Sequence, residues 1–222
     1  MIQMENRKSN IEKLGWVRWI PNALTVLRVI LTLVFLAMIV YAPQLGDGRP
    51  VAFLMTAFVL FVVAGVTDIL DGPIARHYGV TSKFGRVVDP LADKVLVCGA
   101  FLCFAWVGQP ALANLVAAPH HWGVAFGDAV RWGTAAILIL REVGVTVRRH
   151  MAESRGVAFG AVLYGKLKMF VQSFAIGTIM VGWAFVSREW GDWFIVVTYA
   201  LMIALTIFSG IQSIFRPIEP KK

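Results

Sequence analysis

Charged residues and cysteines are scarce in this sequence of 222 residues. Only 15% of the residues are Asp, Glu, Lys or Arg, whereas 58% are hydrophobic, above the roughly 45–50% that is usual for soluble domains. This composition argues against a single soluble domain of this length and favours a helical membrane protein. The two cysteines, Cys98 and Cys103, fall in one apolar stretch. A disulfide between them would constrain little, so we interpret them as small apolar fillers.

The alternation of polar and apolar residues that a transmembrane barrel needs is also missing. Long apolar segments are present instead, and each approaches the ~20 residues that one helical crossing requires. These segments cover residues 22–42, 51–70, 94–118, 129–147, 167–187 and 192–214. The sequence therefore predicts an all-α integral membrane protein with six transmembrane helices.

The N-terminal stretch lacks the small-residue pattern of a cleavable signal. Trp16, Trp19 and Ile20 are mixed there with Lys13 and Arg18, a pattern typical of an amphipathic helix that lies in the membrane interface. An ordered tail is the alternative interpretation. We expect three regions: an N-terminal amphipathic segment (1–20), a six-helix membrane domain (21–216) and a C-terminal tail (217–222).

Positive charge is unevenly distributed between the two sides of the predicted membrane domain. The net charge is +8, from 21 basic and 13 acidic residues. Arg49, Arg131 and Arg188 fall on one side, and the other basic residues fall on or near the opposite side. Because Lys and Arg gather on the cytoplasmic face, we expect both termini to be cytoplasmic, in a bacterial cytoplasmic membrane. Basic residues there suit anionic lipid headgroups, so we expect membrane lipids and no nucleic acid as partners.

Four aspartates lie between the second and third apolar segments, in the stretch DILDGPIARHYGVTSKFGRVVDPLADK. Residues three and four apart share one face of a helix. One face then carries Asp68, Asp71 and Ala75, and another carries Gly85, Asp89 and Asp93. A short turn brings the two helix ends together, and carboxylates at close range need protons or cations to offset them. Oxygen ligands of this kind suit Mg²⁺ or Mn²⁺, so the stretch predicts a site for two ions that could hold a pyrophosphate.

Small residues beside these aspartates favour a ligand site over four separate solvated caps. Gly72, Ala75 and Gly85 leave room for a bulky ligand or for close helix packing, and Arg76 adds a cation next to the expected phosphates. A lone aspartate at the end of a span is usually a solvated cap. Two pairs at helical spacing with small residues interleaved argue against that interpretation.

The pattern D-x2-D-G-x2-A-R-x8-G-x3-D-x3-D resembles the signature of the CDP-alcohol phosphotransferase family, and every position matches. The resemblance implies a homodimer of six-helix protomers that moves a substituted phosphate from a CDP-linked donor to an alcohol and releases CMP, in a site open to the cytoplasmic leaflet. It implies metal ligation by Asp68, Asp71, Asp89 and Asp93, with Asp93, supported by Asp89, in the catalytic role. It also implies contacts between the CDP moiety and Gly72, Ala75, Arg76 and Gly85.

Three looser segments resemble the phosphatidylglycerophosphate synthase branch of that family. They read PNALTVLR (21–28), REVGVTVRRH (141–150) and YGKLKMFVQ (164–172). This resemblance implies CDP-diacylglycerol as the donor and glycerol 3-phosphate as the acceptor.

The charges in these segments fit a phosphorylated acceptor. Arg141 and Arg148 are seven residues apart and share a helix face, and Lys166 and Lys168 open the next helix. Charges within a span are costly and usually face a polar cavity, which cations would line for a phosphate. The alternative is a simple excess of loop cations on the cytoplasmic side. That alternative explains the charges of Arg141 and Glu142 poorly, because apolar residues precede and follow the pair.

Arg28 lies several residues into the first apolar segment and can share a face with Asn22 and Thr25. We expect Asn22 and Thr25 to contact the nucleotide, and Arg28 to contact the acceptor phosphate. Helix capping by Asn22 is the alternative.

The expected reaction is a direct displacement that gives phosphatidylglycerophosphate and CMP. None of the four histidines begins the H-x-K pattern of phospholipase D-like transferases, which argues against a covalent intermediate. A phosphatidylinositol phosphate synthase or a cardiolipin synthase of the same family is an alternative. A divalent-cation transporter is a remote alternative, because the aspartates gather at one membrane edge and no internal repeat is visible.

Overall fold

The computed structural model of the chain describes residues 20–45, 51–78, 83–112, 120–154, 163–185 and 189–215. The side chains that it describes are those of residues 22–45, 51–68, 88–112, 123–154, 167–185 and 190–215. This part of the chain is helical and contains no strand, which confirms the all-α fold class. The predicted N-terminal amphipathic helix, the C-terminal tail, Arg49 and Arg188 lie outside the described residues.

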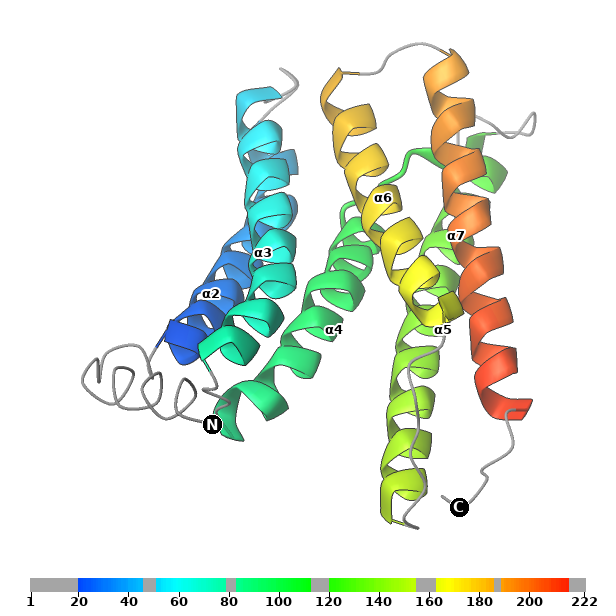
Figure 1. Cartoon of the computed structure of the whole chain (residues 1–222). Coiled ribbons are helices and arrows are strands. Elements are labelled where there is room, and N and C mark those ends of the chain that lie inside the picture. The colour runs from blue at the N-terminus through cyan, green and yellow to red at the C-terminus, as the bar shows by residue number, and fades with distance from the viewer. Residues whose placement is uncertain are drawn as a thin grey trace, which may run out of the picture.

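Long helices pack side by side in the described part of the chain (Figure 1). They are α2 (Ile20–Tyr41), α3 (Val51–Tyr78), α4 (Lys83–Trp106), α5 (His120–Ser154), α6 (Leu163–Phe185) and α7 (Glu189–Phe215), with a short 3₁₀ helix, η2 (Ala42–Leu45), after α2. The helices α2 and α3 pack against each other, α4 contacts α2, α5 and α6, and α7 contacts α5 and α6. In Figure 1 the start of α2, the end of α3 and the start of α4 lie near one another at the lower left.

Five of the described helices are long and apolar enough to cross a membrane: α2, α3, α5, α6 and α7. The helix α4 differs because its charged first turns leave only the run from Val95 to Trp106 free of charged residues, which is short of the ~20 residues that a lipid-facing span needs. It lies between neighbouring helices that replace lipid on several sides. Six crossings therefore stay a prediction, and five apolar spans are what the described helices support.

The predicted third span, residues 94–118, is wrong as one continuous helix. The helix α4 ends at Trp106 because the chain closes there in a Schellman motif. Gly108 has a φ of +76°, the N–H of Gln109 donates to the carbonyl of Phe104 at 2.8 Å, and the N–H of Gly108 reaches the carbonyl of Ala105 at 3.4 Å. These two bonds are the ones that close a helix over a left-handed glycine. Pro110 follows, where it cannot continue a helix.

A stripe of buried side chains joins α2 to its neighbours and changes character along its length. The buried positions recur three or four residues apart, as one face of a helix requires: Thr25, Arg28, Thr32, Phe35, Ile39 and Ala42. The half near the chain's start is polar and the other half is apolar. The matching stripe on α3 runs through Leu54, Ala57, Phe61 and Ala64 and reaches Asp68 one turn later.

The apolar halves of these stripes form the core. Phe35 on α2 meets Phe61 on α3 with ring centroids 5.3 Å apart, and Phe101 on α4 meets Tyr199 on α7 at 6.1 Å. Large apolar side chains such as Leu140 and Phe170 are about 70% exposed on the outer surface (72% and 69%). Exposure on this scale is typical of a surface that faces lipid rather than water.

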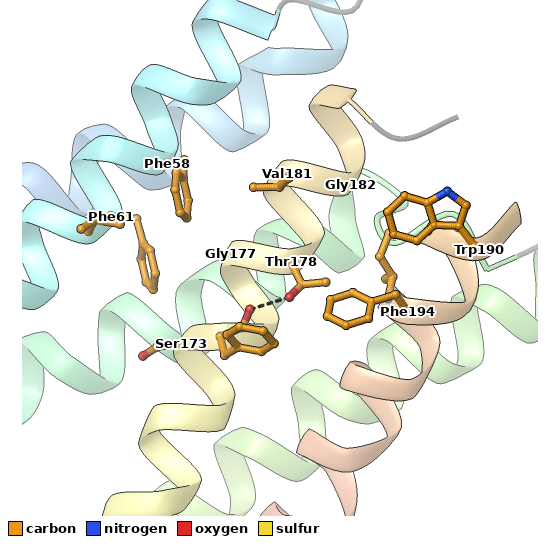
Figure 2. A pocket seen from close by; sticks show the side chains of 13 residues that line it. Phe58, Phe61, Ser173, Gly177, Thr178, Val181, Gly182, Trp190 and Phe194 are labelled. Atoms are coloured by element: carbon orange, nitrogen blue, oxygen red, sulfur yellow. Dashed lines mark hydrogen bonds between the residues drawn. The ribbon is translucent and has the colours of Figure 1, made fainter. Parts of the chain in front are cut away.

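An apolar cavity of about 450 Å³ lies between α3, α6 and α7. Phe58 and Phe61 come from α3, Trp190 and Phe194 come from α7, and the hydroxyl of Thr178 on α6 donates to the carbonyl of Phe174 at 2.9 Å (Figure 2). None of the residues that line the cavity is charged. It is therefore unsuited to a phosphorylated headgroup, and the chemistry must be sought at the charged ends of the helices.

Candidate active site

Carboxylates from α3 and α4 meet at the end of the bundle where α2 begins. The side chain of Asp68 follows the buried stripe of α3, and Asp89 and Asp93 lie one turn apart near the start of α4. The side chains of Asp68 and Asp89 are each 33% exposed. The helical spacing predicted such a convergence, and the structure brings these two carboxylates together.

The group that joins them is the guanidinium of Arg28, whose side chain is completely buried in α2. Its Nη1 lies 2.7 Å from Oδ1 of Asp68 and 3.5 Å from Oδ1 of Asp89. The hydroxyl of Thr25, one turn earlier in α2, donates to Oδ1 of Asp89 at 2.7 Å. Three helices therefore place one buried cation and one hydroxyl donor against two carboxylates, and the charges of this aspartate cluster are partly offset from within the protein.

Asp93 belongs to the same electrostatic environment. Burial raises the pKa of its carboxyl group to about 6, with further contributions from the negative charges of Asp68 and Asp89 and an opposing one from Arg28. A carboxyl group with such a pKa is ionised at neutral pH and takes up a proton more readily than an ordinary aspartate. These are the properties of a general base that works near pH 7.

A second charged cluster lies at the interface of α5 and α6. Oε1 of Glu142 accepts from Nη1 of Arg141 at 2.9 Å, and the same oxygen accepts from Nζ of Lys168. The Lys168 side chain is 3% exposed, Arg141 13% and Glu142 16%. The structure thus brings together Arg141 and Lys168, two of the residues predicted to bind the acceptor phosphate.

A third cation reaches this second cluster from α4. Nζ of Lys94 donates to Oγ1 of Thr146 at 2.5 Å, and the Thr146 hydroxyl donates to the backbone carbonyl of Glu142 at 2.6 Å. Lys94 follows Asp93 directly in the chain. One residue step on α4 therefore separates the acidic cluster from the basic one.

The family model for CDP-alcohol phosphatidyltransferases matches residues 18–208 of this chain. The chain belongs to this family. The match includes the helices that carry both clusters, and it makes the protein an enzyme of the phosphatidyltransferase type.

Curated relatives include several enzymes of one kind. A probable phosphatidylglycerophosphate synthase from Mycobacterium tuberculosis (strain ATCC 25618 / H37Rv) is 33% identical over 203 residues, which cover 90% of this chain and 82% of the relative. The CDP-diacylglycerol–glycerol-3-phosphate 3-phosphatidyltransferase of Bacillus subtilis is 31% identical over 169 residues (73% of this chain, 76% of the relative). The protein of that name from Escherichia coli (strain K12) is 31% identical over 197 residues (87% and 91%).

CDP-alcohol phosphatidyltransferases are generally dependent on divalent metal ions, and the donor set of this chain fits such an ion. Asp68 and Asp89 approach a single guanidinium nitrogen, and carboxylate oxygens are the ligands that hard divalent cations prefer. No three of the described His, Cys, Asp and Glu side chains already form a metal-holding group. The side chain of Asp71, the fourth predicted ligand, lies outside the described residues.

Several other predicted site residues also fall outside the described side chains. They are Gly72, Ala75, Arg76 and Gly85, which we expect at the nucleotide, and Lys166, which we expect at the acceptor. Their assignments stay predictions.

Asn22 and Arg148 have described surroundings of different kinds. Asn22 is the third residue of α2, so it is not the residue that caps this helix, and its Oδ1 is buried without a hydrogen-bond partner among the described residues. The guanidinium of Arg148 donates to the carbonyl of Ile214 on α7. This contact ties the end of α5 to the end of α7.

The sequence did not single out Lys94 or Thr146, and it noted Glu142 only as a charge within a span. A signal for Lys94 existed, because a cation directly follows the last aspartate of the motif. Thr146 carried no signal, because a threonine in an apolar helix usually bonds to its own backbone.

Proposed function

We propose that this enzyme transfers the phosphatidyl group of CDP-diacylglycerol to glycerol 3-phosphate and releases CMP. The names of its relatives support this donor and this acceptor. The observation that carries the proposal is that α4 contacts two clusters of charged side chains, one acidic and one basic. Asp89 and Asp93 belong to an acidic cluster with Asp68, and Lys94 contacts a basic cluster that contains Arg141 and Lys168.

The two clusters suit the two ends of the acceptor. A phosphate monoester carries about −1.5 to −2 charges at pH 7, so it would lie against Lys168 and Arg141. The free primary hydroxyl of a three-carbon acceptor would then extend towards Asp93, which precedes Lys94 on α4. From this arrangement we expect a long or uncharged alcohol to be a poor substrate.

In the proposed reaction, Asp93 removes the proton from the primary hydroxyl as the oxygen attacks the phosphorus that bears the lipid. The new phosphorus–oxygen bond forms while the bond to CMP breaks, and CMP leaves with the electron pair of that bond. A Mg²⁺ or Mn²⁺ ion held by Asp68, Asp71, Asp89 and Asp93, with two ions expected, would supply a Lewis acid for the phosphoryl oxygens. Arg28 and Thr25 orient the carboxylates from α2.

We propose that the site faces the cytoplasmic leaflet and that the enzyme is a homodimer in the bacterial cytoplasmic membrane. The excess of basic residues at the predicted cytoplasmic side supports this orientation. The two acyl chains would stay in the bilayer while the nucleotide enters the polar end of the bundle.

A parallel acceptor assay tests the proposal. Purified protein in mixed micelles receives CDP-diacylglycerol, Mg²⁺ and one labelled acceptor: glycerol 3-phosphate, inositol 1-phosphate or phosphatidylglycerol. We expect Mg²⁺-dependent CMP release with glycerol 3-phosphate and little with the other two. Preference for inositol 1-phosphate or phosphatidylglycerol would assign one of the two related synthases. An absence of CMP with every acceptor would overturn the proposal.

A further inference from the structure

Glu142 is a carboxylate inside an apolar helix, and the reaction derived above assigns it no role. It lies in the span Gly123–Ser154, where a charge persists only if it is paired or functional. Its Oε1 holds two cationic groups at once, Nη1 of Arg141 and Nζ of Lys168. A carboxylate that only neutralised one buried lysine would not need the arginine as well.

The balance of charge around Glu142 leaves an excess of cations. Arg141, Lys168 and Lys94 contribute three positive charges from α5, α6 and α4, while Glu142 contributes one negative charge. The remaining charge of about +2 matches a phosphate monoester at neutral pH. Asp93, which directly precedes Lys94 in the chain, belongs to the aspartate cluster with Asp68 and Asp89.

Arg141 also has a hydrogen-bond donor that is not used within the described residues. Nε of Arg141 is buried and has no hydrogen-bond partner among the described residues. Buried donors of this kind are nearly always satisfied in the working state of a protein. The stem of Arg141 packs closely against α7, where a Cβ on Gly210 would lie 3.2 Å from its Cγ, so the arginine has little freedom to turn away and find water.

We propose that Glu142 is a positioning residue that holds Arg141 and Lys168 side by side as a preformed site for the phosphate monoester of the acceptor. Lysine and arginine side chains lose considerable rotamer freedom when they grip a ligand. A carboxylate that fixes both in the empty enzyme lowers that cost, so the acceptor binds more tightly. This inference rests on the proposed function, because it deepens the description of the same acceptor site.

The test compares Glu142→Gln and Glu142→Asp with the wild type in steady-state kinetics. We expect Glu142→Gln to raise the KM for glycerol 3-phosphate at least tenfold, with the KM for CDP-diacylglycerol within twofold and kcat within about threefold. Glu142→Asp keeps the charge, and we expect it to recover part of the lost affinity. Asp128→Asn is the matched control, because Asp128 also pairs with a buried arginine, Arg131, outside both clusters; it should leave both KM values unchanged.

An unchanged acceptor KM in both Glu142 variants would overturn the inference, and so would parallel changes in the KM values of donor and acceptor. If Glu142→Gln does not fold, Glu142→Asp decides, and we then expect its acceptor KM to rise about threefold or more. Thermal stabilisation by inorganic phosphate provides a readout without turnover: we expect it in the wild type and expect its loss in Glu142→Gln. If the wild type releases no CMP with any acceptor, the proposed function fails, while this binding test still decides the role of Glu142.

Discussion

The replacement Arg28→Met removes the ion pairs that join α2 to the aspartate cluster and therefore tests how the carboxylates are stabilised. Nη1 of Arg28 lies 2.7 Å from Asp68 and 3.5 Å from Asp89, and the arginine side chain is completely buried. Breaking a fully buried ion pair costs about 3–5 kcal/mol. Because both carboxylates are 33% exposed, solvent screening reduces the expected loss to about 2 kcal/mol.

The loss of stability in Arg28→Met should depend on whether a divalent metal ion is bound. A loss of that size lowers the melting temperature by ~4–8 °C for a chain of this length. A divalent ion that binds the folded protein adds about 2.7 kcal/mol at a hundred times its Kd, and it offsets the same negative charges as Arg28. We expect the variant to melt below the wild type in EDTA and to regain most of the difference in saturating Mg²⁺, measured by thermal unfolding in detergent.

Arg131→Met is the matched control for this experiment. Arg131 is also a buried arginine, 5% exposed, but it donates to the carbonyl of Pro110 and pairs with Asp128. We expect its variant to lose the same stability with and without Mg²⁺. If Arg28→Met behaved like this control, the carboxylates near Arg28 would not be the metal ligands, and the reasoning would be refuted.

Two further predictions concern the acidity of the site and the end of α4. Because the pKa of Asp93 is raised to about 6, above its unfolded value, the metal-free protein should lose stability as the pH rises through about 6. Binding of Mg²⁺ should then release about half a proton from Asp93 at pH 6 and almost none at pH 8. A pH indicator in weak buffer measures this release. Equal proton release at the two pH values would contradict the raised pKa of Asp93. Gly108→Ala should cost about 1 kcal/mol in thermal unfolding, because Gly108 has a φ of +76°, and activity should stay unchanged. An undiminished melting temperature would contradict the helix-ending role of Gly108.

Local spacing in the sequence predicted the parts of the site that lie on a single helix. The intervals between Asp68 and Asp71 and between Asp89 and Asp93 each define one helix face. The apolar segments likewise predicted the helices, because their length reports the thickness of the bilayer. The third segment was overextended because apolar residues continue past Gly108 and Pro110, and composition alone does not weigh a glycine that closes a helix.

Contacts between helices were beyond the reach of such patterns. The pairing of Glu142 with Lys168 joins residues that are 26 positions apart on two helices. The approach of Arg28 to Asp68 likewise depends on how α2 packs against α3. Spacing within one helix carries no information about these distances. The sequence therefore predicted that the aspartates converge across a short turn, but it did not predict the contacts that Arg28 and Lys168 make.

The most direct test of the central claim is the rate of CMP release by Asp93→Asn under saturating donor, acceptor and Mg²⁺. Asparagine preserves the shape of the side chain but cannot take the proton, and general-base catalysis typically contributes about 10²–10⁴-fold. We expect a variant with normal thermal stability and a rate at least ~10²-fold below that of the wild type. A folded variant that keeps more than about a tenth of the wild-type rate would contradict the account.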